Sequence, residues 1–314
     1  MSRPVTQGKM YTQRPYRDRS DIARMKRIVG RGFALDPNNM PFGSLEWVVF
    51  GPQRFPPRDS VELWEDGRGE VIGWALLDPA DSFQYRVAPE LDDAALDEEI
   101  AGWGMRGILS WREANGLDAR CAIECWGGDQ SRIEILTRHG FRPSARGGVL
   151  FSQSLDRDIA QPDPPEGWII RGLRDEDVNS RATTQYEAFS PGSKTTPTTW
   201  RYLMDNAPGY DPDLDNVAVG ADGEVGAAAL VWLDHAHKVG EFQPVGTRPA
   251  HQRKGLGRAV LLRGLAKMRE RGMETAIVGT NATNAPAIAL YQSVGFEVCI
   301  QSVEYVLGGA AKGL

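Results

Sequence analysis

Cysteine is scarce in this chain: three of its 314 residues are cysteines. Cys121 and Cys125 lie four residues apart, but no second pair of ligand residues follows at the spacing of a zinc site, and Cys299 is isolated. This pattern predicts neither a disulfide framework nor a metal centre. We therefore expect buried, reduced thiols, no bound metal and a cytoplasmic location.

Positive charge and long apolar runs are also lacking. The formal net charge is −6, whereas proteins that bind nucleic acids usually present a basic face. No apolar stretch approaches the roughly 20 residues that span a bilayer, and residues 1–18 lack the apolar core of a secretory signal. Neither a nucleic acid nor a membrane is therefore expected as a partner. The apolar share of 41% and the charged share of 25% are instead typical of a globular protein.

The length and an internal repeat predict two domains of about 150 residues each. Three short segments of the first half resemble segments of the second half in the same order, at an offset of about 155 residues. We therefore predict domains over 1–156 and 168–314, joined by a linker over 157–167 that is rich in proline and turn residues. The matching pairs are 14–18 with 171–175, 69–75 with 223–229, and 135–141 with 290–296.

Each half has the pattern of a mixed α and β fold. In the second half, the turn residues 221–223 separate two apolar runs, which predicts a hairpin. Farther along, Val260, Leu261, Leu265 and Met268 follow the spacing of one helix face. The expected elements of this half are strands over 168–171, 216–219, 225–233, 238–247, 275–279 and 296–307, and helices over 175–189, 255–271 and 284–293.

The segment over 245–258 has a chemistry that suits a pyrophosphate. Gly255 and Gly257 let the backbone approach a ligand closely, and the helix that begins there adds a partial positive charge. Full positive charges come from Arg253, Lys254 and Arg258.

Two nucleotide-binding loops fit this segment poorly. A Walker loop has Ser or Thr after Gly-Lys, but the order here is Lys254-Gly255 and no hydroxyl residue follows. A Rossmann loop needs a third glycine, where this chain has Val260. Its ribose-binding carboxylate also follows a strand, whereas Glu274 precedes one.

The same segment resembles the Gln/Arg-x-x-Gly-x-Gly/Ala loop of the GNAT superfamily of acyl-CoA-dependent N-acetyltransferases. The run from Gln252 to Gly257 matches it in full, and the second motif of that superfamily follows at the expected distance, from Asn284 through Tyr291 to Phe296. The resemblance covers residues 168–307. It implies an α+β fold of two tandem GNAT domains, each with a central mixed, mostly antiparallel sheet flanked by helices.

The resemblance also assigns roles to residues. It implies acetyl-CoA as co-substrate and Tyr291 as the acid that protonates the departing thiol, while Glu241, on the strand before the loop, is the candidate base. Backbone N–H groups near Val245 and Thr247 would hold the pantetheine arm and the thioester oxygen, and Asn284 would bond the pantetheine or order the tyrosine helix. The full set expected to hold acetyl-CoA is Val245, Thr247, Gln252, Arg253, Lys254, Gly255, Leu256, Gly257, Arg258 and Asn284.

The first half departs from this pattern. An acidic run over 90–99 stands where the second half has its basic loop, and Leu136 takes the place of Tyr291. Like charges would repel a pyrophosphate, so we expect a degenerate GNAT-like domain that supports the fold or shapes the acceptor site. The tandem arrangement resembles the mycothiol synthase family, but the first half of that family keeps a phosphate loop. Its substrate is therefore not carried over to this chain.

These features predict an acetyl-CoA-dependent N-acetyltransferase that transfers the acetyl group directly to a primary amine of a small molecule. Acceptor specificity is expected to come from residues 189–200 and 210–215. Two alternatives stay open: an acyl-CoA-binding sensor or interaction protein without turnover, and an acyltransferase that acts on a protein or peptide amine. A monomer or a homodimer is expected.

Overall fold

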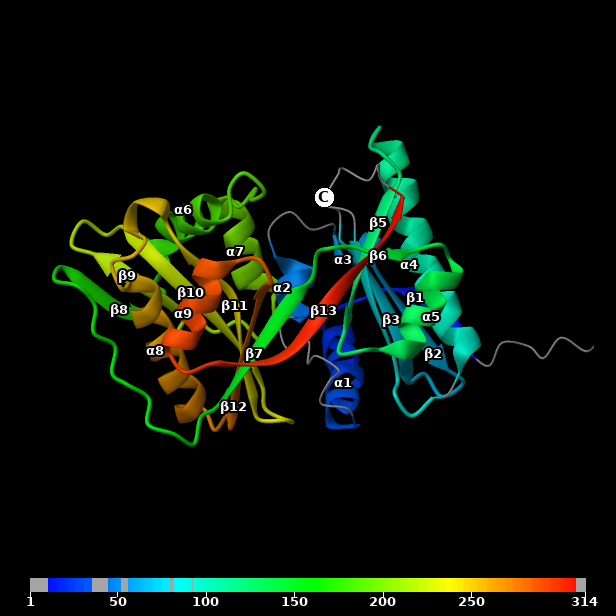
Figure 1. The fold of residues 1–314 in the computed structure, drawn as a ribbon, viewed down its shortest axis with the longest axis horizontal. Helices are drawn as coiled ribbons and strands as arrows, with labels where there is room; N and C mark the ends of the chain where they lie inside the picture. Colours follow the sequence, from blue (N-terminus) through cyan, green and yellow to red (C-terminus); the bar gives the residue numbers. More distant parts are fainter. Residues whose placement is uncertain (1–10, 36–44, 52–55, 79–81, 92, 309–314) are drawn as a thin grey trace, which may run out of the picture.

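The computed structural model describes residues 11–35, 45–51, 56–78, 82–91 and 93–308. The expectations for residues 1–10 and 309–314, and for Asp92 in the acidic run, lie outside these ranges. Figure 1 shows the first half and the second half side by side, with two strands running between them.

A mixed, mostly antiparallel sheet runs through both halves. Its strands follow the order β1-β2-β3-β4-β5-β13-β7-β12-β11-β10-β9-β8, and β6 pairs with β13 beside this path. Within the described ranges, the parallel pairings are β4 with β5 and β11 with β12. The strands of the first half are β1 (Tyr11–Pro15), β2 (Val61–Asp66), β3 (Val71–Asp78), β4 (Ser82–Val87), β5 (Arg120–Trp126), β6 (Arg142–Pro143) and β7 (Gly148–Ser154). Those of the second half are β8 (Trp168–Gly172), β9 (Asp215–Gly220), β10 (Val225–Asp234), β11 (Val239–Thr247), β12 (Thr275–Asn281) and β13 (Glu297–Gly308).

Helices cover both faces of this sheet, because the strands alternate their apolar residues between two cores. In β10, one set of side chains packs in a core shared by the two halves, and the other set packs under α8 and α9. The first set is Ala228, Leu230 and Trp232, and the second is Ala227, Ala229 and Val231. The helices are α1 (Arg19–Leu35), α2 (Leu45–Phe50), α3 (Pro57–Ser60), α4 (Ala94–Ala114), α5 (Gln130–Arg138), α6 (Val178–Ala188), α7 (Pro197–Asn206), α8 (Leu256–Glu270) and α9 (Ala285–Ser293).

The two halves exchange their last strands. Strand β7, at the end of the first half, pairs with β12 of the second half along its whole length. Strand β13, at the end of the chain, continues from β7 onto β5 of the first half. The boundary predicted after residue 156 therefore separates the halves along the sequence but not in space. The last strand of each half pairs with strands of the other half.

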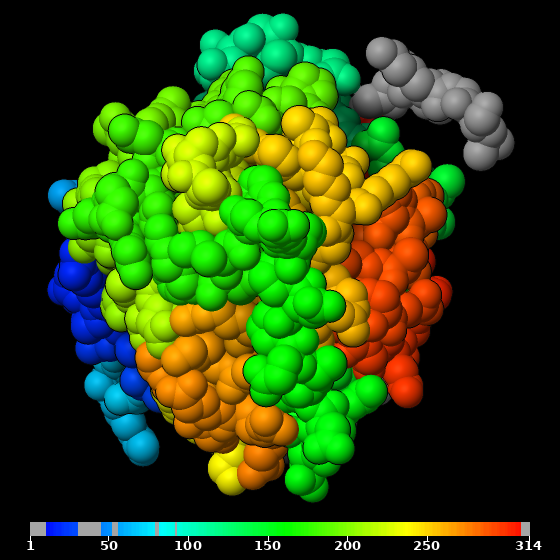
Figure 2. Space-filling view, turned by 90° about the vertical axis from the view of Figure 1, so that its left-hand side faces the viewer, coloured from blue at the N-terminus to red at the C-terminus, as the bar shows by residue number. Residues whose placement is uncertain are grey.

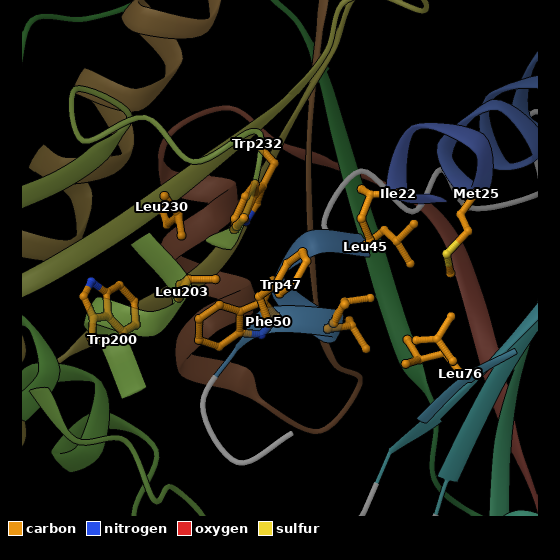
Figure 3. Close-up of a cluster of buried hydrophobic side chains, with 14 of the residues drawn as sticks. Ile22, Met25, Leu45, Trp47, Phe50, Leu76, Trp200, Leu203, Leu230 and Trp232 are labelled. Carbon is orange, nitrogen blue, oxygen red and sulfur yellow. The ribbon is translucent and has the colours of Figure 1, made fainter. Parts of the chain in front are cut away.

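The shared core joins the halves on one face of the sheet. It combines α1 and α2 of the first half with α6 and α7 of the second (Figure 3). The rings of Trp47 on α2 and Trp200 on α7 lie 5.8 Å apart, and Leu45 and Trp232 are fully buried nearby. Each such apolar side chain contributes about 1.5–3 kcal/mol of burial free energy, so the halves stabilise one another.

The linker over 157–167 lies against the second half. Arg157 donates a hydrogen bond to the Gly295 carbonyl at 3.0 Å, and its own carbonyl accepts one from Arg269 of α8. Figure 2 shows this green segment crossing the surface beside the orange helix. The segment predicted to be a linker is therefore held in place by contacts with the second half, which follows it.

The cysteines follow the sequence prediction in part. Cys121 and Cys125 are buried, as expected, but the expectation for Cys299 was wrong because it is exposed. The pairing of β13 with β7 shifts between Val298 and Ile300, and Cys299 is the extra residue at this irregularity. Among the helices of the described ranges, none combines the length and the apolar character needed to cross a bilayer.

Candidate active site

The site begins where two parallel strands of the second half separate. Strand β11 pairs with β12 only from Val239 to Phe242, whereas its later part, up to Thr247, pairs with β10 alone. The backbone of residues 243–247 therefore has no strand partner on the β12 side within the described part of the chain. This agrees with the expected separation near Val245 and Thr247, and it leaves backbone polar groups available to a ligand.

A cavity of about 560 Å³ occupies this separation. Three of the predicted site residues line it together: Val245 of β11, Asn284 at the start of α9, and Tyr291 within α9. Its size lies within the range of small-molecule sites. Further walls come from the rest of β11, from the end of β12, from α6 and the segment after it, with Gln185, Phe189, Ser193 and Thr195, and from Trp47 of the first half.

The loop before α8 forms a second part of the site. Gln252, Arg253, Lys254 and Gly255 are all exposed. Arg253 and Gly255 have positive φ angles of 60° and 84°, so the loop twists between left- and right-handed conformations. Such a backbone turns successive N–H groups toward one concavity, and the first turn of α8 adds N–H groups without helical partners. No side chain caps α8, and a Cβ placed on Gly255 would meet nothing within 4 Å.

The next two residues act by packing. Leu256 and Gly257 are buried, and Leu256 belongs to the core beneath α8. A Cβ on Gly257 would come within 3.1 Å of the Thr247 hydroxyl and 3.3 Å of Leu290. Gly257 therefore lets α8 lie close to the end of β11, and the partly buried Arg258 follows it on the helix.

A buried arginine that the sequence analysis missed anchors this loop. Arg248 is 9% exposed, forms an ion pair with Glu224, and donates a hydrogen bond to the Thr184 hydroxyl at 3.2 Å. His251 also contacts the Glu224 carboxylate, at 2.8 Å, and its ring stands edge-on to Trp168. These contacts hold both ends of the turn that precedes Gln252. The sequence pattern did not indicate these contacts, because Glu224 lies more than 20 residues before Arg248 and His251 in the chain.

Tyr291 lies at the inner wall of the cavity. It is 5% exposed, and its ring packs edge-on against Phe151 and Phe296, with centroids 5.8 Å and 6.3 Å away. Its hydroxyl makes no hydrogen bond with the residues that the structure describes. Burial raises the pKa of Tyr291 well above its usual range. The hydroxyl therefore stays protonated at neutral pH and has a proton to donate.

Asn284 caps the helix that carries Tyr291. Its side-chain oxygen accepts a hydrogen bond from the Ala287 N–H at 3.3 Å, and its amide nitrogen donates to the Thr280 hydroxyl at 3.1 Å. Asn is among the preferred N-cap residues because it satisfies a helix N–H that lacks a partner. Asn284 thus links α9 to the end of β12 and also lines the cavity.

Glu241 lies deeper than the other predicted residues. It is 2% exposed and stands directly opposite Trp232 of β10, on the face of the shared core. Among the described residues that line the cavity, the nearest on its strand face is Gln243, two positions along. The structure therefore does not bring Glu241 into the cavity wall, although it places it beside that wall.

The first half repeats the strand separation but not the loop. Strand β4 pairs with β5 only at Ser82 and Ala122. At the N-terminus of α4, the Asp93 carboxylate accepts hydrogen bonds from the N–H groups of Ala95 and Leu96, at 3.1 Å and 3.0 Å. The amides that a phosphate would use are therefore already occupied by an anion. Leu136, in place of the tyrosine, is 1% exposed in the core of this half.

Comparisons with known proteins agree with this architecture. A model of the acetyltransferase (GNAT) family matches residues 181–296. The mycothiol acetyltransferase of Saccharomonospora viridis is 28% identical over 309 residues, which cover 93% of this chain and 96% of that protein. The mycothiol acetyltransferase of Thermobifida fusca is 30% identical over 244 residues, which cover 72% and 74% of the two chains. The chain belongs to the GNAT acetyltransferase family.

Solved structures share the GNAT fold over nearly the whole chain. A GCN5-related N-acetyltransferase from Sphaerobacter thermophilus has a TM-score of 0.62 at 21% identity, covering 96% of this chain and 97% of its own. A tandem GNAT protein from the clavulanic acid biosynthesis pathway has the same TM-score at 15% identity, with coverage of 96% and 99%. The predicted family and fold class are confirmed, and this GNAT chain is an acyltransferase.

Proposed function

We propose that this acetyltransferase takes the acetyl group from acetyl-CoA and transfers it directly to a primary amine of a small molecule. The observation that carries the proposal is the convergence of three features at the end of β11. These are the separation from β12, the exposed basic loop at the N-terminus of α8, and the protonated hydroxyl of Tyr291 in the cavity between them. Each feature suits a different requirement of acyl transfer.

The basic loop would hold the pyrophosphate of acetyl-CoA, which supplies the activated acetyl thioester. The N–H groups of residues 253–257 and the first turn of α8 offer hydrogen bonds to an anion, and Arg253, Lys254 and Arg258 offer charge. The open space above Gly255 lets a phosphate approach the backbone. In this scheme Leu256 and Gly257 contribute by fixing the helix, and Gln252 borders the loop.

The separated part of β11 would orient the thioester. Backbone N–H groups near Val245 and Thr247 that face the gap can bond the pantetheine arm, and one of them can stabilise the negative charge that develops on the carbonyl oxygen. A single such donor contributes about 10²–10³ in rate in enzymes where it has been removed. Asn284 would border the same arm while it holds α9 in place.

Two side chains would move the protons. Glu241 would accept the ammonium proton of the acceptor through a water molecule, because its carboxylate lies behind the cavity wall. The neutral amine nitrogen can then attack the carbonyl carbon, and the carbon–sulfur bond breaks while the nitrogen releases its second proton to solvent. Tyr291 would donate its hydroxyl proton to the departing sulfur and regain a proton from solvent.

The walls at the acceptor end of the cavity suit a small partner that carries little charge besides its ammonium group. Its described walls there combine the aromatic rings of Trp47 and Phe189 with neutral hydrogen-bonding side chains such as Gln185 and Ser193. Because Trp47 belongs to α2, the domain over 1–156 would shape the acceptor site while the domain over 168–314 carries the chemistry. The relatives are named for mycothiol, also a small molecule, and its amine precursor heads the list of acceptors to test.

The proposal is tested by following thiol release from acetyl-CoA in the presence of single amines. The panel comprises the amine precursor of mycothiol, aminoglycosides, polyamines, amino acids and short peptides. We expect turnover that depends on at least one small amine and exceeds turnover with every peptide. Binding of acetyl-CoA without turnover on any amine would instead favour a sensor, and turnover confined to peptides would favour a protein acyltransferase.

A further inference from the structure

The strand separation of the first half holds a cavity that the proposed reaction does not use. It has a volume of about 310 Å³ and lies between β4 and β5. Gln84 and Arg86 reach it from β4, while Glu124 and Trp126 reach it from β5. Arg132 of α5 and Glu304 of β13 complete the charged part of its wall. The volume is at the small end of the range for ligand sites.

One side of this cavity carries two guanidinium groups. Arg132 is 8% exposed, stacks on the Tyr85 ring at 4.4 Å, and donates one hydrogen bond to the Tyr85 carbonyl at 3.3 Å. Its Nε lies 3.3 Å from the Asp129 carboxylate but is not aligned for a hydrogen bond and has no other partner. Arg86 donates to the same carbonyl at 2.7 Å and forms no ion pair within the described ranges. Two guanidinium groups therefore lie near Asp129, and Asp97 is a second carboxylate in the surroundings of Arg132, without an ion pair to it.

The other side carries an excess of negative charge. Glu124 and Glu304 stand directly opposite each other on β5 and β13. Two like charges in facing positions destabilise the pairing of the strands. Glu304 is compensated by Arg120 at 3.1 Å and by the Ser144 hydroxyl at 2.7 Å. Glu124 accepts only a hydrogen bond from the Ser302 hydroxyl at 3.3 Å, and in the part of the chain that the structure describes no cation pairs with it.

We propose that this cavity binds a small zwitterion of amino-acid size, whose carboxylate meets Arg86 and Arg132 and whose ammonium group meets Glu124 and Glu304. Unpaired charges at a partly dehydrated wall are unfavourable, and a ligand with both charges compensates both sides at once. A ligand with only a negative charge would leave the two carboxylates facing each other. A ligand with only a positive charge would leave the two guanidinium groups without a compensating anion. The site is separate from the acetyl transfer proposed above and does not depend on it.

The experiment measures the melting temperature of the full chain and the calorimetric affinity for matched probes. The zwitterions are glycine, β-alanine and γ-aminobutyrate, which differ in the distance between their charges. Propionate and propylamine each carry one of the two charges of β-alanine. We expect at least one zwitterion to bind and raise the melting temperature, while each single-charge probe binds about tenfold more weakly or not at all.

Two variants test whether the named side chains are responsible. Arg86→Gln and Glu124→Gln should each weaken binding of the best zwitterion by about tenfold or more. The matched controls Arg106→Gln and Glu113→Gln remove exposed charges of α4 outside this cavity and should leave binding unchanged. If Arg86→Gln does not fold, Arg86→Lys provides the second test, since it keeps the charge and should retain partial binding.

Three results would overturn the proposal: no zwitterion binds, propionate binds as well as β-alanine, or Arg86→Gln and Glu124→Gln bind as the native chain does. Acetyl transfer by the folded variants should be unchanged, because neither residue lines the cavity at β11. That readout separates a failure of this site from a failure of the proposed reaction.

Discussion

The helices α4 and α8 occupy matching places in the two halves, but their N-termini differ. At α4, Asp93 turns its carboxylate onto the first free N–H groups and satisfies them. At α8, Gly255 adopts a left-handed conformation and no side chain caps the helix. An occupied helix N-terminus is stable by itself, whereas an unoccupied one is available to an external anion.

The strand separation is common to both halves. Strand β4 leaves β5 in the first half much as β11 leaves β12 in the second, and a cavity lies at each place. The separation is therefore a property of the fold, whereas the loop that follows decides which ligand can be held. The same backbone arrangement is followed by a basic loop and an uncapped helix in the second half, and by an acidic segment and a helix capped by Asp93 in the first.

The largest effect in this comparison should come from Tyr291→Phe, which makes the second half resemble the first at Leu136. We expect kcat to fall by about 10²-fold or more, because the sulfur would leave without a proton donor. KM for acetyl-CoA should change little, since the ring and its packing on Phe151 remain.

The pH profile of the native enzyme gives an independent check of this role. Burial raises the pKa of Tyr291, so the protonated form persists to a higher pH than for an ordinary tyrosine. Deprotonation of Tyr291 should therefore cause no loss of kcat below about pH 10. Unchanged kcat in the Phe variant across this range would remove the acid role.

Gly255→Ala should weaken acetyl-CoA binding by raising its KM about tenfold. An alanine at a φ of 84° costs about 1–2 kcal/mol and shifts the loop toward another conformation. Gly272→Ala is the matched control, because Gly272 has a φ of 81° and equally open surroundings at the other end of α8. Both variants should lose similar thermal stability, and an equal rise in KM in both would contradict a special role for the loop.

Trp47→Ala should raise KM for the amine several-fold while KM for acetyl-CoA stays constant. The indole lines the cavity from the first half, at the end proposed for the acceptor, and rests on Trp200. Leu45→Ala on the same helix removes a fully buried side chain outside the cavity wall, so it controls for lost packing. A matching rise in amine KM for both variants would indicate that α2 acts only through stability.

Asp93→Ala should have the smallest effect, a loss of about 1 kcal/mol in the free energy of unfolding. It removes the cap of α4 but supplies no cation or glycine, so the first half should still bind no acetyl-CoA. Glu113→Ala, an exposed change in the last turn of α4, should leave stability nearly unchanged. Chemical denaturation of the native chain, Asp93→Ala and Glu113→Ala measures these differences in the free energy of unfolding.

Local patterns explain why much of the second half could be predicted. The run from Asn284 to Phe296 predicts a capped helix with Tyr291 on it, and α9 and its Asn284 cap follow that pattern. Gly255 was predicted only to let the backbone approach a ligand, and its left-handed conformation is one that glycine adopts readily. Such features depend on a few neighbouring residues.

Features that depend on distant pairing could not be predicted. Nothing in the sequence of α2 indicates that Trp47 reaches the cavity of the other half. The neighbouring Glu46 helps to hold α2 there, because its carboxylate accepts a hydrogen bond from the Gly209 N–H. The exchange of β7 and β13 is equally hidden, because either strand would suit either sheet edge by composition. Glu241 was placed on the right strand, but its depth behind Gln243 depends on that packing.

We expect only the second half to hold acetyl-CoA. Calorimetric titration of the full chain with acetyl-CoA tests this directly, beside a variant that carries Arg253→Glu and Lys254→Glu. One acetyl-CoA should bind per chain, and binding should be abolished in the variant. Two molecules per chain, or one molecule still bound by the variant, would contradict it.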